Sequence, residues 1–257
     1  MGICDPALMN DTMSRRVTIL QCDDVPQPDR GRHGDVHQQV TKHLRQVSVK
    51  TGLALLINVV DVRVQTPPTP DGTDLYVITG SAAEPFSSEP WIARLRDWLG
   101  DAAARGERMF GICFGHQVIC HALGGQTARA ADWEIGIVGM RERIALGRGG
   151  ETFDSMPENG RSVRLIMSHQ DEVTSLPEGA LHWLEGEFCA QQGMIVPGQI
   201  ATVQGHPEYW RAQVSDLYER RRATLGDRRT DAAQHSVAGV HDGESLTANV
   251  LEHLLKT

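Results

Sequence analysis

A cysteine stands between two glycines near the middle of the chain, in the run Phe110-Gly111-Ile112-Cys113-Phe114-Gly115-His116-Gln117. A short apolar segment typical of a buried strand precedes it, and apolar residues at helical spacing follow it as far as Gly124-Gly125. A tight strand-to-helix turn needs glycine two positions before and after its central residue, because a Cβ there would strike the neighbouring backbone. The unpaired N–H groups of a helix N-terminus also favour a thiolate. The pattern therefore predicts that Cys113 is a nucleophile rather than an ordinary buried cysteine.

A thiolate nucleophile needs a general base, and the base needs a group that orients it. The segment His206-Pro207-Glu208 follows an apolar strand-like run late in the chain. Residues two apart on an extended segment project to the same side, so Glu208 could hold the imidazole of His206 in the required tautomer. A histidine near a turn is more commonly a surface residue, but together with the cysteine turn it is a candidate base.

These segments resemble the class I glutamine amidotransferases, also called triad amidotransferases. The family's nucleophile pattern is matched by Gly111, Cys113, Gly115, His116 and Gln117, and its His-Pro-Glu by His206, Pro207 and Glu208. Ile78-Thr79-Gly80-Ser81 stands where the family has a loop that supplies an oxyanion N–H. Ser168-His169-Gln170-Asp171-Glu172-Val173 resembles the stretch that contacts the amino-acid end of bound glutamine. The resemblance runs from about Val17 to Ala223.

The resemblance implies a mechanism and a set of site residues. Cys113 would attack the γ-carbonyl of glutamine or of a γ-glutamyl amide, His206 would carry the proton, and Glu208 would orient His206. The backbone N–H groups of Gly80, Ser81 and Phe114 would bind the oxyanion. The residues expected to contact substrate are Gln117, Ser168, His169, Gln170 and Asp171. This chemistry needs neither a metal nor an organic cofactor.

The sequence leaves several functions open. The chain resembles a stand-alone member of the family, similar to GMP-synthase-like amidotransferase domains and to γ-glutamyl peptidases. The Thr-Gly-Ser form of its oxyanion loop differs from the Gly-Gly-Pro of nucleotide-synthesis amidotransferases and is closer to the stand-alone members that resemble plant γ-glutamyl peptidases. No Gly-x-x-x-x-Gly-Lys loop is present, so hydrolysis of a γ-glutamyl bond is the first expectation. The alternatives are a glutaminase subunit that delivers ammonia to a separate synthetase, and a non-catalytic regulatory protein of the same fold. An ester-cleaving α/β hydrolase would place the acid many residues before the histidine, which argues against that class.

Strand-like and helix-like segments alternate through the first half of the chain, which indicates a doubly wound, mostly parallel sheet with flanking helices. The second half is richer in short strands and predicts a small additional β layer. The resemblance implies a flavodoxin-like amidotransferase fold. We expect a flexible extension over residues 1–15, the amidotransferase-like domain over 16–225, and a loop with a C-terminal helix packed on the same domain over 226–257.

The composition and net charge of the chain limit the classes of partner that it is expected to bind. The chain has 257 residues, a formal net charge of −8 and a pI near 5.7, which argue against nucleic acid or an anionic membrane as the main partner. The run Arg220-Arg221-Arg222 is expected to be a solvated helix face. The five cysteines show no disulfide or zinc spacing. No secretory leader or bilayer-spanning run is evident, so we expect a cytoplasmic protein with a small-molecule substrate.

Overall fold

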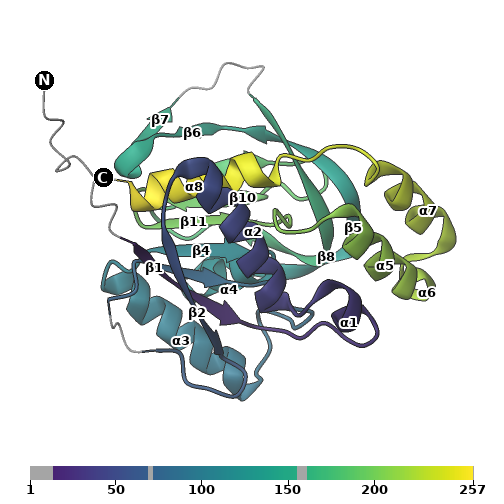
Figure 1. Cartoon of the computed structure of the whole chain (residues 1–257), viewed down its shortest axis with the longest axis horizontal. Helices are drawn as coiled ribbons and strands as arrows, with labels where there is room; N and C mark the ends of the chain where they lie inside the picture. The colour runs from purple at the N-terminus through teal and green to yellow at the C-terminus, as the bar shows by residue number, and fades with distance from the viewer. Residues whose placement is uncertain (1–13, 69–71, 155–160, 257) are drawn as a thin grey trace, which may run out of the picture.

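The computed structural model describes residues 14–68, 72–154 and 161–256 (Figure 1). The predicted extension over residues 1–15 therefore lies almost wholly outside the described residues, and Arg15 already belongs to the first strand. Nine strands form one sheet in the order β2-β1-β3-β4-β11-β10-β9-β5-β8. Their bounds are β1 Arg15–Gln21, β2 Leu55–Asp61, β3 Leu75–Ile78, β4 Met109–Ile112, β5 Gln126–Glu142, β8 Ser162–Ser175, β9 Leu181–Glu185, β10 Gly193–Val196 and β11 Ile200–Val203.

One half of the sheet is parallel. Strands β2, β1, β3, β4 and β11 all run in the same direction. Helix α2 (Val36–Thr51) joins β1 to β2, and α3 (Pro90–Ala104) joins β3 to β4. Parallel neighbours need such crossover helices, since a tight turn can only reverse the chain. The predicted doubly wound α/β fold is confirmed.

The other half of the sheet is antiparallel. Strands β10, β9, β5 and β8 continue the same sheet beyond β11. The turn between β10 and β11 is only three residues long, Pro197–Gln199, which forces the chain to reverse. The additional β layer expected from the sequence is thus mostly an extension of the main sheet. A separate two-stranded sheet is formed by β6 (Ile144–Leu146) and β7 (Thr152–Asp154), with a short 3-10 turn, Arg148–Gly150, between them.

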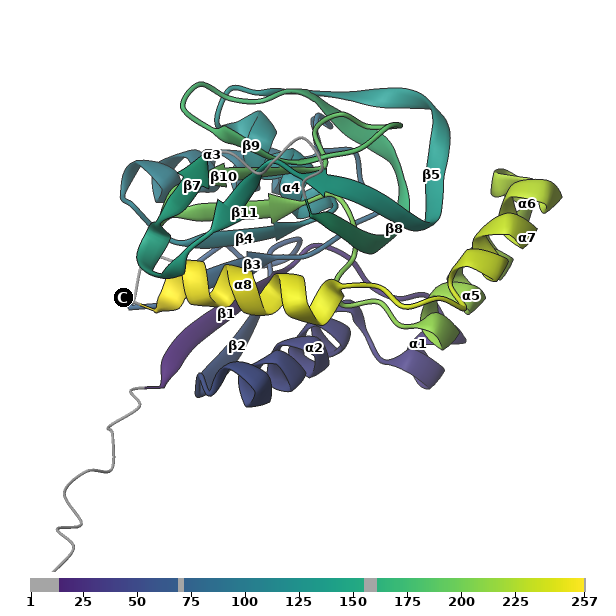
Figure 2. The ribbon, with the colours of Figure 1, turned by 90° about the horizontal axis from the view of Figure 1, so that it is seen from above.

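Helices cover both faces of the parallel half (Figure 2). On one face α2 and the C-terminal helix α8 (Gly243–Leu255) pack side by side, and their apolar residues share a core with β1 and β4. On the other face α3 and α4 (Phe114–Ala122) pack against β3. Local signals fix the ends of α2, where Asp35 and Gln38 form a capping box and Gly52 ends the helix in the left-handed conformation. The parallel strands are therefore held rigidly between two helical layers.

The loop expected between residue 226 and the C-terminal helix contains a helix instead. Helix α7 spans Asp227–Ser236 and follows α5 (Arg211–Arg220) and α6 (Arg222–Leu225). These three helices project beside β5 and β8 (Figure 2), where Ala233 and Val237 are buried. The sequence of α7 has almost no apolar periodicity, and the helix buries only two of its residues, Thr230 and Ala233. The packing of α7 against the rest of the domain stabilises a helix that the local sequence does not predict.

A one-turn helix, α1 (Asp29–His33), interrupts the loop after β1 and lies close to α5. Among the described residues, no helix is both long enough and apolar enough to cross a bilayer.

Candidate active site

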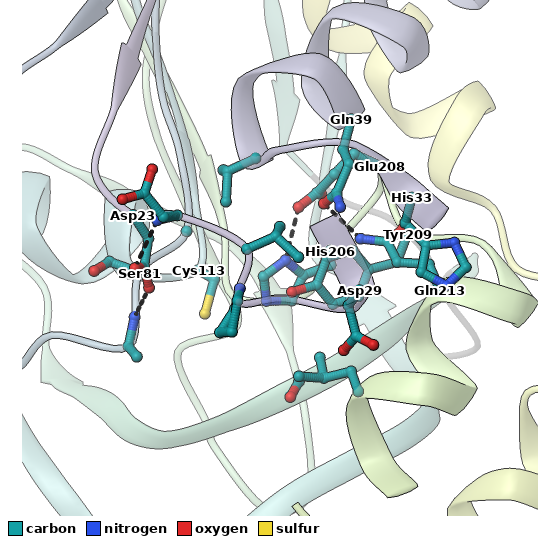
Figure 3. Close-up of a pocket in the computed structure, with 18 of the residues that line it drawn as sticks. Asp23, Asp29, His33, Gln39, Ser81, Cys113, His206, Glu208, Tyr209 and Gln213 are labelled. Atoms are coloured by element: carbon teal, nitrogen blue, oxygen red, sulfur yellow. Dashed lines mark hydrogen bonds and ion pairs between the residues drawn. The ribbon is translucent and has the colours of Figure 1, made fainter. Parts of the chain in front are cut away.

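The predicted chemistry converges at the carboxyl ends of the parallel strands. Asp23 follows β1, Gly80 follows β3, Cys113 follows β4 and His206 follows β11. These residues line one cavity of about 170 Å³ (Figure 3). Crevices at this edge of an open α/β sheet are the usual binding positions of the fold, because loops from several strands meet there.

The turn at Cys113 is strained. Its backbone has φ of 53° and ψ of −105°, and it is the one non-glycine residue with positive φ in the described part of the chain. A Cβ at Gly111 would lie 2.6 Å from the carbonyl oxygen of Gly115, and a Cβ at Gly115 would overlap the carbonyl oxygen of Ile78. The prediction that both positions exclude a side chain is confirmed. Strain of this kind costs about 1–3 kcal/mol and persists where the surrounding structure enforces it.

His206 and Glu208 form a buried pair beside Cys113. Nδ1 of His206 donates to Oε1 of Glu208 at 2.8 Å, and the two residues are 4% and 5% exposed. The Tyr209 ring stacks on the imidazole with centroids 3.9 Å apart. Burial opposes protonation of His206, but the negative charges of Glu208 and of the Cys113 thiolate outweigh it and raise the pKa of His206 above its usual range. Since Nδ1 is engaged by Glu208, the ring is fixed in orientation and Nε2 is left for proton transfer.

Gln204 is a neighbour of the thiol that the sequence analysis missed. Its side-chain amide donates to Sγ of Cys113 at 3.6 Å and accepts from Gln117 at 3.1 Å. Gln204 is fully buried and precedes His206 by two residues. The sequence holds one indication that Gln204 belongs to the site. It precedes His206 by two residues, and alternate residues of an extended segment project to the same side. The Gln204 amide is thus held between Gln117 and the Cys113 thiol.

The predicted oxyanion loop lies against the candidate nucleophile and base. A Cβ on Gly80 would lie 2.9 Å from Cε1 of His206 and 3.7 Å from Cβ of Cys113. The Asp23 carboxylate accepts a hydrogen bond of 2.7 Å from the N–H of Ala82 and so anchors the loop from β1. Ser81 lines the cavity, and Phe114 begins α4 directly after Cys113. The structure thus gathers all three residues predicted for oxyanion binding next to Cys113, and their role stays a prediction.

The five predicted substrate contacts line a second cavity, of about 180 Å³, which also reaches Cys113. Several of them are bonded to one another. Gln117 donates to the carbonyl oxygen of Asp171 at 2.6 Å, and Gln170 donates to the carbonyl oxygen of Ala130 at 3.2 Å. The Asp171 carboxylate pairs with Arg129. The second cavity therefore has a wall of fixed polar groups, as binding of an amino acid would require.

His169 is the most firmly held residue of that wall. Its Nδ1 bonds to the carbonyl oxygen of Asp171 at 3.0 Å, and its Nε2 bonds to Glu134 at 2.8 Å. Gln192 donates to the same Glu134 oxygen at 2.7 Å. Both ring nitrogens of His169 are thus occupied within the protein, and any effect of the ring on substrate would act through its positioning of β8.

The arginine run is not a solvated face throughout, which corrects the expectation from sequence. Arg220 and Arg221 line the first cavity, which contains His206, and Arg221 also lines the second cavity. Arg222 alone makes only surface ion pairs, with Glu219, Asp227 and Asp231. The charge run could not reveal this division, because α5 ends at Arg220, Arg221 is its C-cap and Arg222 begins α6.

The remaining described cysteines lie away from both cavities. Burial raises the pKa of the Cys22 thiol to about 12, the pKa of Cys120 to about 12, and the pKa of Cys189 further still. Of the four described cysteines, only Cys113 both lines a cavity and has a histidine beside it. In the described ranges, no three His, Cys, Asp or Glu side chains are grouped closely enough to hold a metal ion.

Fold and site together define an α/β protein with a cysteine at a strand-to-helix elbow and a histidine–carboxylate pair beside it. The family profile described as "Glutamine amidotransferase class-I" matches residues 33–217. The chain belongs to the class I glutamine amidotransferase family.

Comparison with individual proteins agrees with this assignment. The chain is 34% identical over 154 residues to gamma-glutamyl peptidase 4 of Arabidopsis thaliana, covering 56% of this chain and 57% of that protein. It is 31% identical over 113 residues to one subunit of the glutamine-hydrolysing GMP synthase of Archaeoglobus fulgidus, covering 43% of this chain and 57% of that protein. The alignments therefore span little more than half the length of these relatives.

Solved structures share the fold. The crystal structure of a glutamine amidotransferase from Thermotoga maritima superposes with a TM-score of 0.65 at 16% identity, covering 93% of this chain and 96% of that one. A glutamine amidotransferase from Methylobacillus flagellatus gives 0.63 at 16% identity, covering 95% and 96%. The predicted amidotransferase fold is confirmed over nearly the whole chain.

Proposed function

We propose that the protein hydrolyses γ-glutamyl amide bonds through a γ-glutamyl thioester on Cys113. The observation that carries the proposal is the strained Cys113 facing the same cavity as the buried His206–Glu208 pair. A strained cysteine beside a histidine held by a carboxylate is the arrangement that nucleophilic acyl transfer requires. The named activity of the plant relatives, gamma-glutamyl peptidase, supports a γ-glutamyl substrate.

In the acylation half-reaction the Cys113 thiolate attacks the γ-carbonyl carbon and a C–S bond forms. The oxyanion accepts hydrogen bonds from the backbone N–H groups of Phe114 and of the Gly80–Ser81 loop, each contributing about 3–4 kcal/mol in comparable sites. The protonated His206 then gives its proton to the leaving nitrogen as the C–N bond breaks. The raised pKa of His206 suits this step, because it keeps the imidazolium available near neutral pH.

In the deacylation half-reaction water attacks the thioester. His206, now neutral, removes a proton from that water, and the C–S bond breaks to release glutamate. The Cys113 thiolate and the protonated His206 are restored. A reducing compartment such as the cytoplasm would keep the thiol available for each cycle.

A second candidate is a glutaminase subunit that supplies ammonia to a separate synthetase. The similarity to a GMP synthase subunit favours it, since that relative is named as one component of a glutamine-hydrolysing enzyme. Both candidates use the same thioester, and they differ in the leaving group and in the need for a partner protein.

The test offers glutamine, glutathione and a γ-glutamyl anilide in parallel and measures the glutamate released. Cys113→Ala should abolish release, whereas Cys120→Ala, which changes a buried cysteine of the adjoining helix α4, should retain it. Release from the peptide or the anilide supports the hydrolase. Release from glutamine alone supports the ammonia-supplying role, and equal activity in the Cys113→Ala variant would refute both.

A further inference from the structure

We infer that Arg221 binds the α-carboxylate of the γ-glutamyl substrate and so makes the enzyme specific for γ-linked glutamate with a free α-carboxylate. This inference rests on the proposed function. It assigns to Arg221 a role that neither the nucleophile motif nor the substrate-contact stretch contains, because the residue comes from the end of α5.

Arg221 occupies the junction of the two cavities. Both cavities are lined by Arg221 together with Cys113 and Ser168. Nη1 of Arg221 donates to Oγ of Ser168 at 3.0 Å, and the guanidinium lies 5.4 Å from the centre of the Trp133 ring. The hydroxyl and the ring hold the guanidinium in place beside the reacting thiol, so little side-chain entropy remains to be lost on binding.

No carboxylate among the described residues forms an ion pair with Arg221. Its neighbours in the chain do form such pairs: Arg220 pairs with Asp29, and Arg222 pairs with Glu219. Arg129, the other arginine of the second cavity, is engaged by Asp171 and Glu84. A half-buried guanidinium that no described carboxylate pairs with favours an anion in the cavity, and its planar fork matches a carboxylate.

The chemistry of the substrate fits this position. A short carbon chain separates the α-carboxylate of a γ-glutamyl group from the carbonyl that Cys113 attacks, so both ends fit within one small cavity. The second cavity is also lined by Asp171, but the buried carboxylate of Asp171 is already paired with Arg129. Arg221 thus supplies a positive charge that complements the carboxylate of an amino acid bound there.

The experiment compares two anilide substrates that differ only at the α-position, a γ-glutamyl anilide and its α-carboxamide analogue. In the wild type the carboxylate substrate should have the lower KM. Arg221→Gln should raise that KM by about tenfold to a hundredfold, the usual effect of losing a hydrogen bond to a charged group, and leave the KM of the carboxamide nearly unchanged. Arg221→Lys should lose part of the preference, and Arg222→Gln, the adjacent surface arginine, should keep all of it. If the role of Arg221 is purely structural, Arg221→Gln should raise the KM of both substrates by the same factor, and that result would overturn the inference.

Two further experiments distinguish this inference from recognition of the leaving group and from failure of the proposed hydrolase function. If Arg221→Gln loses discrimination between γ-glutamylglycine and its C-terminal amide but keeps it at the α-position, the arginine recognises the leaving group and the assignment is wrong. Calorimetric binding of glutamine and its α-amide to Cys113→Ala, with and without Arg221→Gln, needs no turnover. Lost preference for glutamine in the double variant supports the Arg221 assignment even if the wild type hydrolyses none of the substrates, whereas absence of any such preference in Cys113→Ala overturns it.

Discussion

Cys113, His206 and Glu208 come from two separate turns, and their place in one site could be predicted because each turn carries a local motif; their catalytic roles stay a prediction. Glycine at positions 111 and 115 is demanded by contacts with the backbone, and this demand is visible in the sequence. Gln204 and Arg221 could not be predicted in the same way. Their proximity to Cys113 depends on how β11 and α5 end in three dimensions, and an isolated glutamine or an arginine run is compatible with many roles.

The negative charge of Glu208 gives a prediction at the scale of one residue. Because Glu208 contributes to the raised pKa of His206, the imidazolium persists to higher pH and the alkaline limb of activity should lie above the ordinary range of histidine. Glu208→Gln keeps an acceptor for Nδ1 but removes the charge, so the alkaline limb should move to lower pH and kcat/KM at neutral pH should fall by roughly 10²-fold or more. The measurement is the pH profile of kcat/KM for both proteins. An alkaline limb at the same pH in both would show that Glu208 does not set the protonation of His206.

At the scale of elements, predictability follows the strength of the apolar pattern. The buried strands β1 and β3 contain short apolar runs and the helix α2 has amphipathic spacing, and they follow the strand–helix alternation that the sequence predicts for the first half of the chain. Helix α7 has almost no apolar periodicity, so the sequence predicts a loop in its place. The antiparallel continuation of the sheet is also beyond prediction, because strand order depends on pairings between residues far apart in the chain.

The close approach of α4 to β3 gives a prediction about an element. Gly115→Ala places a methyl group against the Ile78 backbone and should lower the free energy of unfolding by about 1–3 kcal/mol while displacing Cys113. Gly100→Ala in α3 is the matched control, since the nearest atom to the added Cβ is the carbonyl oxygen of Ala122 in α4, at an ordinary contact distance of 3.7 Å, and alanine favours a helix interior by about 0.5–1 kcal/mol. Urea unfolding of both variants measures the difference. Equal stability of the two would contradict the account of the elbow.

At the scale of the whole molecule, the C-terminal helix α8 belongs to the same core as the strands that carry the site. Leu251 of α8 is fully buried in a cluster that also contains Val17 of β1 and Cys113 itself. The chain from residue 226 onward therefore contributes to the framework of the active site, although the family profile ends at residue 217.

This packing predicts that a change far from the cavity will destabilise the entire domain. Leu251→Ala should lower the free energy of unfolding by about 2–5 kcal/mol, the range for a buried leucine replaced by alanine. Val240→Ala, at a position 72% exposed just before α8, should stay within about 0.5 kcal/mol of the wild type. Thermal unfolding of the two variants decides the matter. If Leu251→Ala unfolds like the wild type, α8 is not part of the common core.

The central claim is that Cys113 becomes covalently acylated during turnover. Rapid acid quench of the protein mixed with a γ-glutamyl anilide, followed by intact-protein and peptide mass spectrometry, tests it most directly. We predict a mass increase of one γ-glutamyl group, located on the peptide containing Cys113, labile to hydroxylamine and absent from Cys113→Ala. Turnover without such an adduct, together with glutamate release that survives in Cys113→Ala, would contradict the account.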